Sequence, residues 1–509
     1  MHATVISIQA RRRPHAAILA TCAATLAIAM SITASGVALA HVDIAPHIGI
    51  LQLQWIMNGF ILSFAACLLP AGSIVDRLSA RRIFLWGSAI LSGGIIFTVT
   101  AGSFGVLMLG RLLQGAGAAL VSAAGPAELA SSIEDDAQRK RAFGYLGASG
   151  GIGLTLGALL SGLVLDEGGW RSAFALHLPF AVASFCCARQ GFSRRPIQAA
   201  TRFDWGGALL SAIFITAAMV CSIFGPLLGW LSLPVICAFC IACVGGWAFV
   251  RCEARAAAPL LRVTVLRNRQ FIVASGACVL FTTVWVALFV YVPLHMSVSY
   301  ARSGDEVGTT MLALMVPALV MPLLASRCVQ YVRVETVLAA GFSLMVFGLV
   351  LLFAAWSAHA RAYEIAGLII CGAGAGSLYG LSDYFALSTV PPEHVGLASG
   401  AFNLLRLAGD ALGTIVPAAV LVHTMRNLLA DVAPVELLRP VLNELAAGRF
   451  DALDGLALDV GTSDLIRHTA LECFHDGVLR AVIVLAAFAA VGMALVCVDR
   501  LAAGSRSAL

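Results

Sequence analysis

The sequence predicts an all-α polytopic membrane protein with fourteen transmembrane spans. Of its 509 residues, 60% are hydrophobic and only 12% are charged, whereas an ordinary soluble protein is roughly 25% charged. Apolar runs of about 20 residues, the length that crosses about 30 Å of hydrocarbon, recur along the whole chain. Arginines gather in the connections between these runs. Lipid rather than water must therefore solvate most of this chain.

The apolar runs between charged residues define the expected spans. We place them at 16–40, 53–73, 83–101, 104–124, 143–165, 172–188, 205–225, 230–250, 271–293, 308–325, 336–356, 362–387, 397–422 and 477–498. The first run follows a basic stretch, as a signal peptide would. It is too long for the apolar region of such a peptide and more spans follow, so we expect it to be retained.

The arginines also predict the orientation of the chain. If the N-terminus lies inside, the cytoplasmic connections hold most of the basic residues, and the short outer loops carry only Arg171, Arg302 and Arg361. This bias agrees with the positive-inside rule. With an even number of spans, both termini are expected in the cytoplasm, and the longest soluble segment is an outer loop at 423–476.

The spans and basic connections divide the chain into two similar halves with an insertion. We expect a cytoplasmic N-terminal tail at 1–15, a six-helix bundle at 16–188 and basic linkers with two inserted helices at 189–270. A second six-helix bundle at 271–498 includes the outer loop 423–476, and a cytoplasmic tail follows at 499–509. Repeats of this kind are common in transporters, which bind substrates near the membrane midplane between the repeats.

Several other function classes lack their signatures in this sequence. The basic residues form no basic face with interleaved aromatic residues, so nucleic-acid binding is not expected. Lys140 is the only lysine, and no G-x-x-x-x-G-K-[ST] motif for phosphate binding is present. Three cysteines in one apolar span, Cys237, Cys240 and Cys243, have metal-like spacing but no fourth ligand. We predict no metal, no cofactor and no enzymatic activity.

Two motifs in the first half carry a resemblance to a known family. The connection between the second and third spans reads Gly72-Ser73-Ile74-Val75-Asp76-Arg77-Leu78-Ser79-Ala80-Arg81-Arg82, and the fourth span contains Arg111-Leu112-Leu113-Gln114-Gly115-Ala116-Gly117. With the glycines of the fifth span (Gly147, Gly151, Gly153, Gly157 and Gly162) and the fourteen spans, they resemble the drug:proton antiporter branch of the major facilitator superfamily. The resemblance implies a major-facilitator-type fold of two six-helix bundles plus two inserted helices, with transport by alternating access.

The first motif suggests a conformational latch. Gly72, Asp76, Arg77, Arg81 and Arg82 place one carboxylate and three guanidinium groups at the inner surface. Such a charge cluster can hold helices together in one access state and separate in the other. The alternative interpretation is that these arginines only set the topology.

Three ionisable residues are expected at membrane depth, where an unpaired charge is costly. The resemblance associates Arg111 with proton coupling. In the thirteenth span, Arg406-Leu407-Ala408-Gly409-Asp410 places a carboxylate where the family has glycine, one helical turn from Arg406. Asp410 and Arg406 are therefore candidates for proton coupling, the alternative being a static ion pair that neutralises a buried arginine.

The first span departs from the family pattern D-x-T-x-x-N-x-A-L-P. Its matching stretch is Ser31-Ile32-Thr33-Ala34-Ser35-Gly36-Val37-Ala38-Leu39-Ala40, so Ser31 replaces the carboxylate. We hypothesise that Asp410 took over the protonation role lost at Ser31. In the sixth span, His177 stands where the family usually has asparagine.

Other polar residues have weaker assignments. Asn58, Gln114, Asn403 and Trp285 are candidates to line a substrate cavity, although hydrogen bonding between helices or aromatic packing explains them as well. Asp383 and Glu128 are expected as solvated charges near helix ends. His295 follows a proline at the outer end of the ninth span and could be a gate or simply a loop residue.

The function predicted is export of a small organic molecule by proton antiport across a bacterial inner membrane. The alternative is an exporter or facilitator of a siderophore or natural product, with altered or lost proton coupling. An intramembrane aspartyl protease is disfavoured because Gly409-Asp410 lacks the G-x-G-D pattern. A sensor or scaffold is disfavoured because no soluble signalling domain is attached. The expected partners are substrate, protons and lipid, and the chain would act as a monomer, alone or with periplasmic partners.

Overall fold

The computed structural model describes residues 14–38, 50–192, 203–229, 231–256, 268–358, 360–430, 441–450, 453 and 460–506. Most of the predicted N-terminal tail, and parts of the predicted linkers and outer loop, lie outside these ranges. Within them the chain is helical and contains no strand. Fourteen segments are long and apolar enough to cross a membrane. The predicted fold class is therefore confirmed.

The chain forms two compact units. Unit 1 contains Met1–Phe271 and Ala386–Leu404, and unit 2 contains Ile272–Phe385 and Leu405–Leu509. Residues 386–404, which the sequence analysis placed in the second bundle, thus group with unit 1. One long helix, α15, contributes its first residues to unit 1 and the remainder to unit 2.

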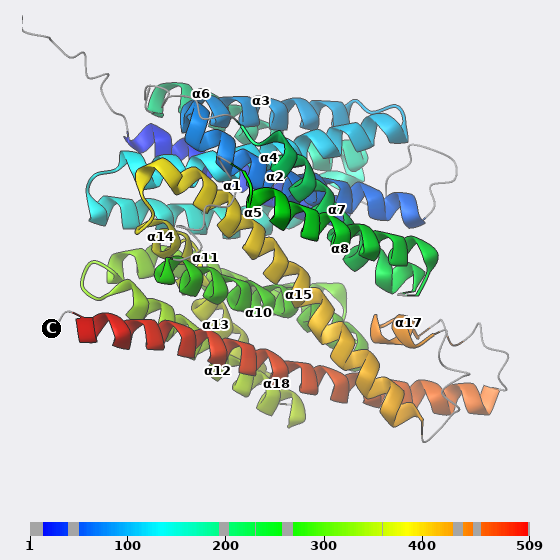
Figure 1. Ribbon diagram of the computed structural model, residues 1–509. Helices are drawn as coiled ribbons and strands as arrows, with labels where there is room; N and C mark the ends of the chain where they lie inside the picture. Colours follow the sequence, from blue (N-terminus) through cyan, green and yellow to red (C-terminus); the bar gives the residue numbers. More distant parts are fainter. Residues whose placement is uncertain are drawn as a thin grey trace, which may run out of the picture. The chain divides into compact units, whose positions relative to one another are not determined.

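In the part of unit 1 that the structure describes, eight complete helices follow one another along the chain (Figure 1). They are α1 (Pro14–Ala38), α2 (Ile50–Leu78), α3 (Ala80–Val99), α4 (Phe104–Ser132), α5 (Asp136–Ala175), α6 (Leu178–Gly191), α7 (Trp205–Leu228) and α8 (Leu233–Glu253). The α5 helix contains the fifth predicted span and enters the sixth, with a break at Gly169, where φ is 65°. The break lies at the start of the second of two candidate spans, Asp136–Leu165 and Gly168–Gly191.

Small residues explain how the helices of unit 1 approach one another. A Cβ on Gly153 would lie 2.7 Å from the Leu26 carbonyl oxygen, and one on Gly157 would lie 2.7 Å from the Met30 Cα. These two glycines therefore let α5 pack directly against α1, as small residues do between membrane helices. A Cβ on Gly162 would meet no atom within 4 Å, so this member of the glycine series has no packing role in the structure.

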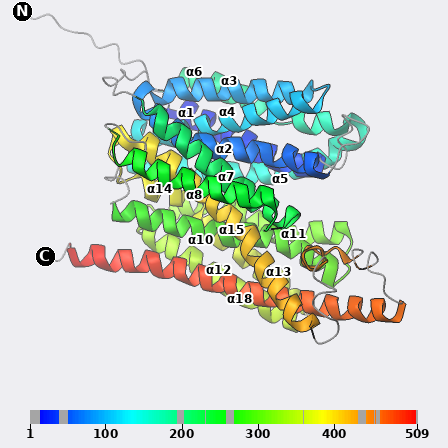
Figure 2. The same ribbon diagram turned by 45° about the vertical axis from the view of Figure 1, so that its right-hand side comes forward.

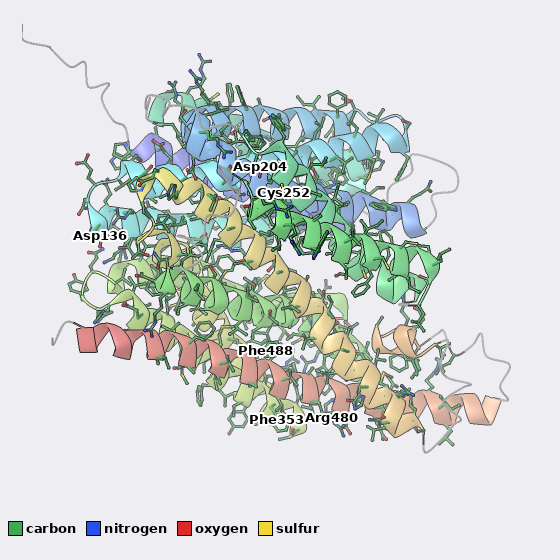
Figure 3. All side chains as sticks on the ribbon, in the orientation of Figure 1. Asp136, Asp204, Cys252, Phe353, Arg480 and Phe488 are labelled. Atoms are coloured by element: carbon green, nitrogen blue, oxygen red, sulfur yellow. The ribbon has the colours of Figure 1, made fainter. Side chains whose placement is uncertain are left out.

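Polar side chains begin several helices by accepting hydrogen bonds from otherwise unpaired backbone amides. Ser103 begins α4, Asp135 begins α5 and Asp204 begins α7 in this way. Figure 3 labels Asp204 close to Cys252, because the start of α7 and the end of α8 meet in one helical hairpin. The α7–α8 pair occupies the two spans that the sequence analysis interpreted as an insertion.

Unit 2 contains the remaining helices, α10 (Arg269–Ser299), α11 (Gly304–Cys328), α12 (Val334–Ser357), α13 (Arg361–Leu378), α14 (Leu381–Leu387), α17 (Leu442–Ala446) and α18 (Val460–Arg506). The α10 helix begins at the end of unit 1, and the η2 turn (Pro392–His394) and the start of α15 (Val395–Leu429) lie in unit 1. Within unit 2, α12 packs against α13 and α18 (Figure 2).

Two segments of unit 2 differ from the expected boundaries. The span predicted at 362–387 is divided into α13 and α14 at Tyr379–Gly380, where Gly380 has a φ of 74°. The outer loop predicted at 423–476 is shorter than expected, because α15 continues to Leu429 and α18 already begins at Val460. Charged and polar residues at these helix ends made the apolar runs look shorter than the helices are.

Candidate functional site

The predicted latch begins at the end of α2. The Asp76 carboxylate accepts hydrogen bonds from the backbone amides of Gly396, at 2.7 Å, and Leu397, at 2.9 Å. Both amides belong to the first turn of α15, where backbone N–H groups have no helical acceptor and the helix dipole favours an anion. A Cβ on Gly72 would lie 2.6 Å from the Gly396 carbonyl oxygen, so only glycine allows this approach.

The three latch arginines differ in their surroundings. Arg77 donates to the Ser73 hydroxyl at 2.5 Å and lies over the ring of Phe203. Arg81 donates to the carbonyl oxygen of Arg189 at 2.8 Å, which joins α3 to the end of α6. Arg82 is exposed. The motif therefore contacts the start of α15 through Asp76 and the end of α6 through Arg81.

Arg111 lies at the centre of a buried polar cluster in unit 1. Its side chain is 1% exposed. The Nε atom donates to the Ile56 carbonyl oxygen at 3.0 Å, and Nη1 donates to Ser31 Oγ at 2.9 Å and to Gln114 Oε1 at 2.8 Å. Helices α1, α2 and α4 thus all contribute to holding one guanidinium group.

Neighbouring groups fix the position of this cation. Gln114 Nε2 donates to Thr98 Oγ1 at 2.7 Å and to the Gly94 carbonyl oxygen at 3.2 Å. The guanidinium lies over the rings of Phe60, at 4.9 Å, and Phe174, at 5.5 Å. In the described part of the chain, no carboxylate forms an ion pair with Arg111. Its charge is stabilised by neutral dipoles and aromatic faces alone.

His177, at the start of α6, lies close enough to Arg111 to interact with it electrostatically. Its side chain is fully buried, and neither ring nitrogen has a hydrogen-bond partner among the described residues. Buried polar atoms are usually satisfied, so this histidine is exceptional. We refer to Arg111, Ser31, Gln114 and His177 together as the Arg111 centre.

Unit 2 holds the second buried arginine in a different way. Arg406 forms a salt bridge of 2.5 Å with Asp383, which lies in the short α14 helix. This corrects two expectations. The partner of Arg406 is Asp383 rather than Asp410, and Asp383 is buried rather than solvated. Glu128, the other carboxylate expected at a solvated helix end, is also buried.

Asp410 is half-buried one turn further along α15 and interacts electrostatically with Arg406. No ion pair to Asp410 is found within the described ranges. The turn between these residues packs closely on α10, since Thr282 Oγ1 donates to the Arg406 carbonyl oxygen and Thr283 Oγ1 to that of Gly409. We refer to Arg406, Asp383 and Asp410 as the Arg406 cluster, which contains two carboxylates for one guanidinium.

The four residues predicted to line a cavity have separate environments. Gln114 belongs to the Arg111 centre, and Asn58 is half-buried on α2. Asn403 Nδ2 donates to the Ser399 carbonyl oxygen of its own helix at 2.9 Å and to the Ser122 carbonyl oxygen of α4 at 3.4 Å. Trp285, in unit 2, is buried with its ring perpendicular to that of Tyr379.

The described residues form no metal-binding cluster. No group of three or more histidine, cysteine, aspartate or glutamate side chains could hold a metal ion there. The three cysteines with metal-like spacing, Cys237, Cys240 and Cys243, are exposed on α8. They follow one another along a single helix, and they form no metal-binding group with other described residues.

Comparison with known proteins identifies the family. The family model described as Major Facilitator Superfamily matches residues 21–414. The chain belongs to this superfamily. It is accordingly a membrane transporter rather than an enzyme, and it spans the membrane many times, as the sequence predicted.

Relatives of this transporter include drug exporters of Mycobacterium tuberculosis. The multidrug resistance protein Stp is 29% identical over 403 residues, which cover 77% of this chain and 74% of Stp. The drug efflux pump JefA is 29% identical over 440 residues, which cover 84% of this chain and 85% of JefA. The human organic anion transporter MFSD10 shares the fold, with a TM-score of 0.59 at 14% identity over 96% of this chain and 99% of that chain.

Sequence reasoning missed a buried polar cluster in unit 2 of the transporter. Glu364 is 1% exposed and accepts hydrogen bonds from Arg302, at 2.8 Å, and from Trp356 Nε1, at 3.1 Å. His295, left open as gate or loop residue, is buried in α10 and lies 3.0 Å from His475 on α18. A lone glutamate near the start of an apolar span was the available signal, because such a charge needs a partner.

Proposed function

We propose that this transporter exports a small organic molecule in exchange for protons, across the inner membrane of a bacterium, with both termini in the cytoplasm. The drug exporters among its relatives support the direction and the substrate size. The Arg406 cluster carries the proposal of proton coupling. Its two carboxylates cannot both be neutralised by one guanidinium, and Asp383 already forms the salt bridge.

Asp410 is then the group that exchanges the proton. A carboxylate at membrane depth without an ion-pair partner is more stable when protonated, and access to water reverses this preference. Arg406 and Asp383 remain a neutral pair in both states, so Asp410 alone changes the charge of the cluster when it exchanges its proton. Arg111, which the family resemblance associates with coupling, would contribute as a fixed positive charge, because arginine retains its proton.

The latch supports alternating access in the same proposal. The two hydrogen bonds from the start of α15 to Asp76 exist in this conformation. Breaking them removes two charge-assisted hydrogen bonds at once, so the contact has two discrete states, formed and broken. A bistable contact of this kind is what a rocking transporter needs.

The test is substrate-dependent collapse of a preset pH gradient in inverted membrane vesicles. The panel contains lipophilic cationic drugs and aromatic carboxylic acids, and the variants are Asp410→Asn and Asp305→Asn. Asp305 is exposed in the first turn of α11, so its variant is the matched control for removing a carboxylate. We expect proton release by the original chain and by Asp305→Asn, and none by Asp410→Asn.

Substrate counterflow in the absence of a gradient separates coupling from transport. The proposal requires that Asp410→Asn still exchanges substrate, since alternating access remains intact. If Asp410→Asn releases protons normally, coupling does not reside at Asp410. If the original chain exchanges substrate without moving protons, it is a facilitator and antiport is wrong.

A further inference from the structure

The Arg111 guanidinium has unused hydrogen-bond donors. A guanidinium group carries five N–H donors, and three of them point to Ile56, Ser31 and Gln114. The two N–H groups of Nη2 have no acceptor among the residues that the structure describes. A side chain that is 1% exposed therefore keeps two charged donors available.

The neighbouring histidine adds to this unsatisfied polarity. His177 is buried beside Arg111 with both ring nitrogens unpaired in the described part of the chain. A neutral imidazole can donate through one nitrogen and accept through the other. Two side chains from α4 and α6 thus present unmet hydrogen-bonding capacity at one place in unit 1.

The charge balance of the centre points to an anion. An uncompensated buried charge costs several kcal/mol, and the resemblance places a family carboxylate at the position of Ser31. Here the Ser31 hydroxyl contacts Arg111 Nη1 instead. A serine oxygen accepts the hydrogen bond but supplies no negative charge, so the residues that the structure describes leave Arg111 without a counter-charge.

We propose that the Arg111 centre binds the carboxylate of an organic anion, which accepts from Arg111 Nη2 and from His177. Bidentate or charge-assisted bonds between guanidinium and carboxylate are among the strongest polar contacts in proteins. The rings of Phe60 and Phe174, which flank the guanidinium, favour an anion attached to an apolar or aromatic body. This inference rests on the proposed function, because it names the chemical class of the exported molecule.

The experiment measures binding to the purified full-length chain in detergent, without any gradient. Thermal unfolding is recorded against increasing salicylate, with benzamide and benzyltrimethylammonium as neutral and cationic probes and with chloride as an inorganic anion. We expect salicylate to raise the unfolding temperature, with the other three probes at least tenfold less effective.

Two variants place a carboxylate inside the centre. Ser31→Asp and Gln114→Glu each supply the missing counter-charge, and Ser31→Asn is the matched control that adds the bulk of aspartate without its charge. We expect salicylate affinity to fall at least tenfold from Ser31→Asn to Ser31→Asp. Gln114→Glu is close in shape to the original residue and tests the same point if the position-31 variants fold poorly.

The outcomes decide the inference separately from proton coupling. A salicylate response that disappears in Ser31→Asp or Gln114→Glu supports it. The inference is wrong if cationic and anionic probes act equally, if only chloride acts, or if added carboxylates leave salicylate binding unchanged. Because no proton movement enters the assay, a failure here leaves antiport intact, and failure of antiport in vesicles does not alter this binding result.

Discussion

The two units hold a buried arginine by different physical means. In unit 1, Arg111 is surrounded by a carbonyl oxygen, a hydroxyl, an amide oxygen and two aromatic rings. In unit 2, Arg406 is bound to a buried carboxylate, with a second carboxylate one turn away. Within the described ranges the first centre is therefore positive and the second is negative when both carboxylates are ionised.

This difference suits the two centres to different tasks, proton coupling in unit 2 and anion binding in unit 1. A carboxylate that exchanges a proton suits coupling, whereas a guanidinium cannot exchange one near neutral pH but can bind an anion. The serine at position 31 and the aspartate at position 410 are the two residues that create the contrast. A variant that changes the charge in one unit should therefore alter the free energy of unfolding differently from a variant that changes the charge in the other unit.

The largest expected effect is loss of both carboxylates from the Arg406 cluster. In Asp383→Asn/Asp410→Asn, Arg406 remains buried without a counter-charge, which should lower the free energy of unfolding by about 3–5 kcal/mol. Asp410→Asn alone should cost less than about 1 kcal/mol, because the salt bridge to Asp383 persists. Denaturant unfolding of these two variants and the original chain in detergent measures this. Equal losses in Asp410→Asn and the double variant would contradict the assignment of the partner.

The next largest effect belongs to the neutral support of Arg111. Gln114→Leu removes the amide oxygen that accepts from Nη1 and should cost about 2–3 kcal/mol, because a charged donor is left unsatisfied. Thr98→Val removes two neutral bonds, one from Gln114 and one to the Gly94 carbonyl oxygen of its own helix, and should cost about 1 kcal/mol. Comparing the free energies of unfolding of the two variants in the same detergent tests whether neutral dipoles stabilise the Arg111 guanidinium. A Gln114→Leu variant as stable as Thr98→Val would show that they do not.

A smaller effect is expected at Asp76, whose carboxylate accepts hydrogen bonds from two backbone amides of α15. Asp76→Asn keeps one oxygen acceptor and loses the charge at the start of α15, which should cost about 1–2 kcal/mol. Glu393→Gln, which removes an exposed carboxylate from the η2 turn, is the control. Urea unfolding of both variants would reveal the difference, and identical curves would argue against a latch at this helix end.

The smallest effect is expected for the part-buried contact between the imidazole rings of His295 and His475. His475→Phe keeps a ring against His295 and removes their 3.0 Å hydrogen bond, at a cost of about 1 kcal/mol. The same unfolding assay applies, with His468→Phe as a control at an exposed ion pair. If His475→Phe costs as much as Gln114→Leu, charge is not what distinguishes the Arg111 centre.

The spans could be predicted because hydropathy is a local property of the sequence. All fourteen segments are present, and the errors lie at their ends, as at Leu429 and Val460. Helices project beyond the hydrocarbon with polar residues on their surface, so a hydropathy pattern stops earlier than the helix does. The pairing of α7 with α8 as an inserted hairpin was also accessible, since the basic connections flank it.

The partners of the buried charges could not be predicted in the same way. Arg406 and Asp410 are neighbours on one helix, and that spacing suggested a pair. The structure gives Arg406 a carboxylate from α14 instead, because α13 ends at Leu378 and Gly380 turns the chain with a φ of 74°. The same turn buries Asp383, which the sequence had suggested was solvated. A break inside an apolar run leaves little trace in hydropathy.

The sequence by itself determined that this chain dissolves in lipid, how many times it crosses, and to which family it is similar. Those properties depend on composition, on the length and spacing of apolar runs and on short motifs, all of which are local features of the sequence. Only the tertiary structure decided which atoms meet Arg111 and Arg406. At membrane depth a charge is tolerated only through its partners, and those partners come from helices that are distant in sequence. The charge of each centre is therefore a property of the packing.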